Sequence, residues 1–133
     1  MARVLIVEDQ PELARIAYLV VTRDGHDAQI AFDGYSALAA LEGGGFELVL
    51  VDNVMPGGMD GEDLVRAIRA DAALAHLPLI AVTAKAMLEE QEAMREAGVC
   101  AIVVKPYRAQ ELRDAITREL ARKERTPLAS APV

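Results

Sequence analysis

The sequence predicts an α/β protein with one doubly wound, parallel five-stranded sheet and helices on both faces. Four short runs are apolar throughout, as strands buried on both faces of a sheet are: residues 4–7, 48–51, 79–82 and 101–104. Stretches with helical periodicity lie between these runs. Regular alternation of strand and helix favours parallel strands joined by right-handed crossovers. The 133 residues fit one domain of this kind.

The remaining elements follow from turn and capping residues. A weaker strand with polar residues is expected over residues 27–31, after the turn Asp24-Gly25, as an edge of the sheet. Asp60 is a candidate helix cap and Gly98 a candidate helix stop. The expected helices span residues 11–23, 35–41, 60–70, 85–97 and 108–123.

The organisation along the chain is expected to be simple. Residues 1–123 should form one domain, and residues 124–133 a flexible tail, because that last segment lacks periodicity and apolar residues. The apolar run near the N-terminus is shorter than a signal peptide needs, and no run approaches the length that spans a membrane. We therefore expect a soluble protein without membrane contacts.

Charge and cysteine use narrow the partners and the compartment. The net charge is −7 and the pI is about 4.8, so no nucleic-acid partner is expected, because its phosphates would be repelled. Cys100 is the lone cysteine and lies in an apolar run, where we expect it to be a small buried hydrophobe. A chain without an internal disulfide fits a reducing, cytoplasmic setting.

Each of the four buried runs is followed directly by charged or reactive residues, namely Glu8-Asp9, Asp52, Thr83 and Lys105. Polar residues often just end a strand, and any one of these has that simpler explanation. In an open parallel sheet, however, the carboxyl ends of the strands share one edge, and ligands bind there. The coincidence at four strands predicts that the five side chains meet in one site.

The charges in this set point to a divalent cation. Glu8, Asp9 and Asp52 sum to −3 and Lys105 brings the total to −2, which one Mg²⁺ would neutralise. Carboxylate oxygens are ligands that suit this ion. A carboxylate, a metal, an ammonium and a hydroxyl together suit phosphoryl transfer to an aspartate.

A known family carries the same residues at these places. The matching motifs are Val4-Leu5-Ile6-Val7-Glu8-Asp9, Asp52, Met55-Pro56, Met59-Asp60-Gly61, Val82-Thr83-Ala84 and Lys105-Pro106. Together they resemble the response-regulator receiver domains of two-component signalling, over nearly the whole folded chain. The resemblance implies a flavodoxin-like fold with strand order 2-1-3-4-5 and a phosphorylation-dependent signalling switch rather than an enzyme.

The resemblance also implies a role for each site residue. Asp52 would be the phosphoacceptor, and Thr83 and Lys105 would contact the phosphoryl oxygens. Asp9 and Asp52 would bind Mg²⁺ directly and Glu8 through a water molecule.

Further positions are implied to bind metal or to tune the switch. The backbone carbonyl of Val54 would be another Mg²⁺ ligand, and a cis bond would precede Pro106. Val54 and Lys85 would border the phosphoryl group and slow its hydrolysis. Ala84 and Ile102 complete the set of switch positions.

The chain departs from the family at two places. Gly57-Gly58 looks like a one-residue insertion, which should loosen the loop before the helix at residues 60–70. Ile102 stands where receivers commonly have an aromatic residue or histidine, so the usual aromatic rotamer switch is not expected to operate.

Other functions are weaker matches. A phosphatase of the haloacid-dehalogenase type, acting on small phosphate esters, would have a second aspartate where Val54 stands. A flavin carrier would have a glycine-rich or hydroxyl-rich phosphate cradle in place of the acidic Glu8-Asp9-Gln10-Pro11. An interaction module with a dead site would lack one or more of the residues needed for phosphorylation, and all are present.

The resemblance implies protein partners. A histidine kinase or phosphotransfer protein would supply the phosphoryl group. A downstream protein would bind the face formed by residues 85–97, 101–104 and 108–123. The segment at residues 76–87 looks like free-standing receivers of bacterial cell-cycle relays and also like receivers of hybrid kinases. We expect a free-standing receiver.

Overall fold

The computed structural model describes the backbone of residues 2–52, 58–84 and 88–130, and the side chains of those up to residue 122. Strands and helices alternate along the chain: β1 (Arg3–Val7), α1 (Pro11–Arg23), β2 (Asp27–Ala31), α2 (Gly34–Glu42), β3 (Leu48–Asp52), α3 (Gly61–Ala70), β4 (Leu79–Thr83), α4 (Leu88–Ala97), β5 (Ala101–Val104) and α5 (Ala109–Ser130). The ten expected elements are therefore all present.

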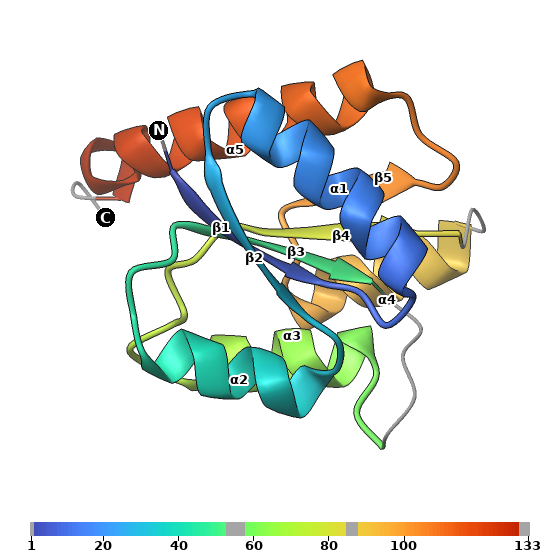
Figure 1. Cartoon of the computed structure of the whole chain (residues 1–133). Coiled ribbons are helices and arrows are strands. Elements are labelled where there is room, and N and C mark those ends of the chain that lie inside the picture. The colour runs from blue at the N-terminus through green and yellow to red at the C-terminus, as the bar shows by residue number, and fades with distance from the viewer. Residues whose placement is uncertain (1, 53–57, 85–87, 131–133) are drawn as a thin grey trace.

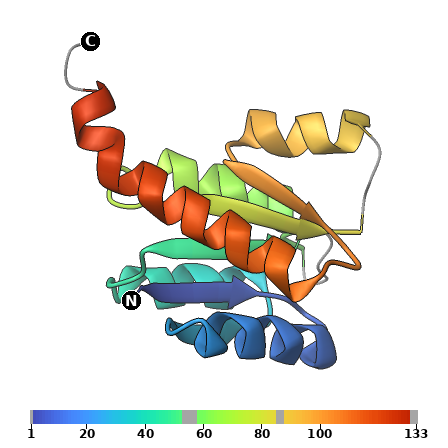
Figure 2. The same cartoon turned by 90° about the horizontal axis from the view of Figure 1, so that it is seen from above.

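The strands form one parallel sheet in the order β2-β1-β3-β4-β5, as predicted. Helices α1 and α5 cover one face of the sheet, and α2 and α3 cover the other (Figure 1). Viewed from above, α4 lies along one side of the molecule and its C-terminal end leads into β5 (Figure 2). Among the described helices, none combines the length and the apolar character that a membrane span requires.

Each strand of the sheet's centre contributes to two hydrophobic clusters. In β1, Leu5 and Val7 belong to the cluster under α2, α3 and α4, whereas Val4 and Ile6 belong to the cluster under α1 and α5. The same alternation holds in β3 and β4, because successive side chains of a strand point to opposite faces. Burial on both faces explains why these strands are apolar throughout.

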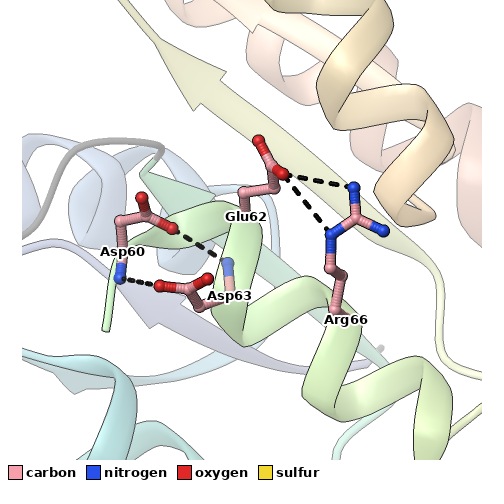
Figure 3. Close-up of polar contacts among 4 residues, drawn as sticks. All are labelled: Asp60, Glu62, Asp63 and Arg66. Atoms are coloured by element: carbon pink, nitrogen blue, oxygen red, sulfur yellow. Dashed lines mark hydrogen bonds and ion pairs between the residues drawn. The ribbon is translucent and has the colours of Figure 1, made fainter. Parts of the chain in front are cut away.

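Helix α3 begins with a capping box. The Asp60 carboxylate accepts a hydrogen bond from the Asp63 N–H at 2.9 Å, and the Asp63 carboxylate accepts one from the Asp60 N–H at 3.2 Å (Figure 3). Two amide donors that the helix leaves unpaired are thereby satisfied. The prediction of Asp60 as a helix cap is confirmed, and the cap fixes the start of α3 shortly after the site residue Asp52.

Two expectations about burial were wrong. Strand β5 is only half-buried, because it is an edge of the sheet. Cys100 is exposed: it precedes β5, and its sulfur lies 3.6 Å from Nη2 of Arg69.

Helix α5 continues as helix to Ser130, beyond the expected end at residue 123. The division into a domain over residues 1–123 and a flexible tail over residues 124–133 stays a prediction.

Candidate functional site

The parallel register brings the predicted site residues to one edge of the sheet. Val7 of β1 pairs with Val51 of β3, so Glu8 and Asp52 follow at the same level. Asp52 pairs in turn with Val82 of β4, which immediately precedes Thr83. The polar residues at the carboxyl ends of the central strands therefore lie side by side.

Three carboxylates meet at this edge. Glu8, Asp9 and Asp52 each have a carboxylate oxygen within 4.8 Å of the others. Glu8 and Asp52 are only 5 % and 6 % exposed. Charges this close and this poorly hydrated repel each other unless a cation balances them.

Lys105 supplies one such cation from the segment after β5. Its Nζ lies 2.7 Å from Oε1 of Glu8 and 3.4 Å from Oδ1 of Asp52. Its backbone N–H donates to the Thr83 carbonyl at 2.7 Å, which extends the pairing of β5 with β4 by one residue. This hydrogen bond fixes the Lys105 backbone at the edge of the sheet where its ammonium contacts Glu8 and Asp52.

The pKa of Glu8 reflects these contacts. Burial alone would raise it, but hydrogen bonds with Lys105, Asp52 and the Gln10 N–H outweigh burial and hold the pKa below its ordinary value. Glu8 is therefore a carboxylate at neutral pH, as a ligand-binding role requires.

Asp9 gives the clearest indication that the acidic cluster suits a cation. Its Oδ1 is buried, yet among the described residues it has no hydrogen-bond partner. A buried carboxylate oxygen without a partner is costly, and a cation bound between Asp9 and its two acidic neighbours would satisfy it. The donor set consists of hard oxygen atoms, which fits Mg²⁺.

Thr83 and Ala84 lie at the end of β4. Thr83 is 2 % exposed, whereas Ala84 is exposed. Ile102 in β5 packs against the cluster under α2, α3 and α4, on the face of the sheet away from α1. The bond between Lys105 and Pro106 is cis, as the resemblance implied.

Some predicted positions lie outside the described residues. These are Val54 with the motif Met55-Pro56, Gly57 of the Gly57-Gly58 pair, and Lys85. Gly58 is described, and its φ of +87° lies in the region that favours glycine.

A cavity of about 320 Å³ adjoins the acidic cluster, and its lining was not predicted from the sequence. Its wall includes Asp52 and Lys105, Leu13 and Ile16 of α1, and Tyr107. Burial and the negative charge of Glu8 raise the pKa of the Tyr107 phenol. The helical pattern over residues 11–23 does not show that the space beside Leu13 and Ile16 is open.

The comparisons with known proteins agree with this geometry. The sequence model of the response regulator receiver domain matches residues 4–117. The chain is a response-regulator receiver domain. It is 40 % identical over 117 residues to the chemotaxis protein CheY of Pseudomonas aeruginosa, covering 87 % of this chain and 94 % of that protein. It is 38 % identical to the chemotaxis protein CheY-3 of Vibrio cholerae, covering 87 % of this chain and 89 % of that one.

Solved structures show the same fold. A CheY-like receiver domain protein from Methanospirillum hungatei superposes with a TM-score of 0.87 at 27 % identity, covering 95 % of this receiver and 98 % of that chain. Receivers act in phosphorylation-dependent signalling, bind Mg²⁺ at an acidic pocket, and interact with histidine kinases and downstream effectors. In this receiver, Glu8, Asp9 and Asp52 form the acidic cluster.

Proposed function

We propose that this receiver accepts a phosphoryl group on Asp52 and thereby changes the partners that it binds. The observation that carries the proposal is the position of Asp52: it ends the central strand β3, belongs to the acidic cluster, and lies 3.4 Å from the Lys105 ammonium. An Asp52 oxygen would form a bond to phosphorus as the bond between phosphorus and the donor's imidazole nitrogen breaks. The nitrogen keeps the electron pair, and the product is an aspartyl phosphate.

Mg²⁺ is the proposed cofactor. Asp9 and Asp52 would bind it directly, Glu8 would bind it through water, and the Val54 carbonyl, outside the described residues, would complete the protein ligands. The unsatisfied Oδ1 of Asp9 supports this assignment. When bound, the ion would neutralise negative charge on the carboxylates and on the incoming phosphate.

Thr83 and Lys105 are proposed to bind the phosphoryl oxygens. Lys105 Nζ already lies between Glu8 and Asp52, so an oxygen added at Asp52 would come within its reach. The Thr83 hydroxyl is a donor at the end of the neighbouring strand. Together they would offset charge that develops on the transferred group.

We propose that catalysis stops at this receiver's own modification and slow autodephosphorylation. A phosphatase acting on small esters is not favoured, because the position two residues after Asp52 is Val54 and not a second acid. The family match supports a switch in place of such an enzyme.

A histidine kinase or a phosphotransfer protein is the proposed donor. Asp52 is one of the residues that line the largely apolar cavity between α1 and Tyr107. The cavity would therefore give a donor protein an apolar binding surface beside the acceptor. A downstream protein is proposed to bind the face formed by α4, β5 and α5. No nucleic-acid or membrane partner is proposed, given the net charge of −7, and the proposed location is the cytoplasm.

Intact-protein mass spectrometry tests the acceptor assignment. Wild type incubated with acetyl phosphate and Mg²⁺ should gain one phosphoryl group, and the gain should vanish without the metal. Asp52→Asn should fold normally and gain nothing, because an amide keeps the shape of the side chain but is a poor nucleophile. A full phosphoryl gain in Asp52→Asn would refute the assignment.

A further inference from the structure

One arginine ties the end of α3 to the end of α4. Arg69, in the last turn of α3, donates two hydrogen bonds to the Gly98 carbonyl, from Nε at 2.9 Å and from Nη2 at 2.8 Å. Its Nη1 donates to the carbonyls of Ala75 and Leu77, both at 2.7 Å. Four charge-assisted hydrogen bonds from one guanidinium therefore join α3 to the segment between α3 and β4 and to the residue that follows α4.

The residue that receives Arg69 is shaped for it. Gly98 has a φ of +130°, and a Cβ added there would lie 2.6 Å from Cγ of Arg69. The N–H groups of Gly98 and Val99 donate to the Met94 carbonyl, at 3.1 and 3.2 Å, and close the C-terminal end of α4. A cation at this end is also favourable to the helix dipole.

Burial of α4 is confined to the same half of the helix. Met94 is 1 % exposed and Ala97 is 6 % exposed, and both belong to the cluster shared with α2 and α3. Residues 88–93 are exposed or half-buried, and Leu88 at the start of the helix is 67 % exposed. Segments with few buried apolar contacts open and shift at lower free-energy cost than segments in the core.

We infer that Arg69 is a positioning residue that makes the C-terminal end of α4 a fixed pivot. The inference rests on the proposed function, because the motion is driven from the phosphorylation site. Leu88 follows the buried site residue Thr83 by five residues, so the end of α4 that is nearer to the site along the chain is the end without a buried side chain. α4 then turns about the Arg69–Gly98 contact, and its first half moves most.

Amide hydrogen exchange on the unphosphorylated chain tests the pivot itself. Arg69→Met should speed exchange at the Gly98 and Val99 amides by roughly tenfold or more, because the hydrogen bonds to a charged group are lost. Arg69→Lys, which keeps the charge but not the fork, should have a smaller effect. Arg66→Met is the matched control on the same helix, since Arg66 pairs only with Glu62 among the described residues and should leave these amides unchanged. Equal effects of Arg69→Met and Arg66→Met would overturn the inference.

Distances between spin labels test whether the first half of α4 moves more than its C-terminal end. In a Cys100→Ser background, Glu42→Cys on α2 is labelled together with either Leu88→Cys or Glu96→Cys, all at exposed positions. Beryllium fluoride with Mg²⁺ replaces the phosphoryl group. The 42–88 distance should change and the 42–96 distance should stay the same. Equal changes in both distances, or no change in either, would overturn the proposed turning of α4 about its C-terminal end.

Mass spectrometry after acetyl phosphate keeps the two hypotheses apart. If wild type gains no phosphoryl mass, the proposed function fails, and the exchange comparison alone decides whether Arg69 fixes α4. If wild type is phosphorylated but the exchange of Gly98 and Val99 is insensitive to Arg69, only the pivot fails.

Discussion

At the scale of single residues, Lys105 governs the charge of the site. Its ammonium lies against two nearly buried carboxylates, at 2.7 Å from Glu8 and 3.4 Å from Asp52. A buried charge left without its partner is strongly destabilising, so the carboxylates need either Lys105 or a metal ion. The ammonium and the metal therefore act on the same negative charge.

Metal affinity should separate Asp9 from Lys105. Asp9→Ala removes a proposed direct ligand and should weaken Mg²⁺ binding by roughly tenfold or more. Lys105→Ala removes the ammonium that contacts Glu8 and Asp52, and so leaves more negative charge for the metal to offset; Mg²⁺ affinity should stay equal or rise. Calorimetric titration of both variants with Mg²⁺ measures this, and weaker binding by Lys105→Ala would contradict the charge argument.

The lifetime of the phosphorylated state should depend on Val54 and Lys85, which lie outside the described residues. The valine side chain cannot hydrogen-bond an attacking water, and the lysine is expected to shield the phosphoryl oxygens. Replacing Val54 by Asn and Lys85 by Glu should speed hydrolysis roughly tenfold, since about 1.4 kcal/mol of barrier is worth that factor. Time courses of phosphate release at equal Mg²⁺ test this expectation; an equally stable or longer-lived phosphate in the double variant would count against it.

At the scale of elements, the capping box should stabilise α3 measurably. Asp60→Ala removes the side-chain acceptor for the Asp63 N–H and should lower the free energy of unfolding by about 1 kcal/mol. Arg66→Ala is the control on the same helix, because its exposed pair with Glu62 is worth about 0.5 kcal/mol or less. Urea unfolding of both variants gives the comparison. A loss for Arg66→Ala as large as that for Asp60→Ala would show that the cap is not special.

The elements could be predicted wherever the local pattern decides them. Strands buried on both faces are recognisable as apolar runs, and Asp60 as a cap by its place before a helix. The environment of Cys100 could not be predicted, because its apolar neighbours in sequence do not show that it precedes an edge strand. The continuation of α5 past residue 123 was also not predicted, because that segment has no apolar periodicity.

At the scale of the whole molecule, topology assembles the site. The sequence predicts that Glu8, Asp9, Asp52 and Lys105 meet, because parallel strands share one carboxyl edge. It does not predict the cavity next to them or the hydrogen bonds that Arg69 donates to the Gly98 carbonyl. Both depend on how helices pack on the sheet and on the path of loops, and neither leaves a periodic signal.

The central claim is that Asp52 receives the phosphoryl group, and chemical trapping tests it most directly. Wild type is phosphorylated with acetyl phosphate and Mg²⁺, reduced with borohydride, digested, and sequenced by mass spectrometry. Reduction converts an aspartyl phosphate to homoserine, so the modified residue is read from the peptide mass. We expect homoserine at position 52 alone. Homoserine at position 9 or 60, or none at all, would contradict the proposal.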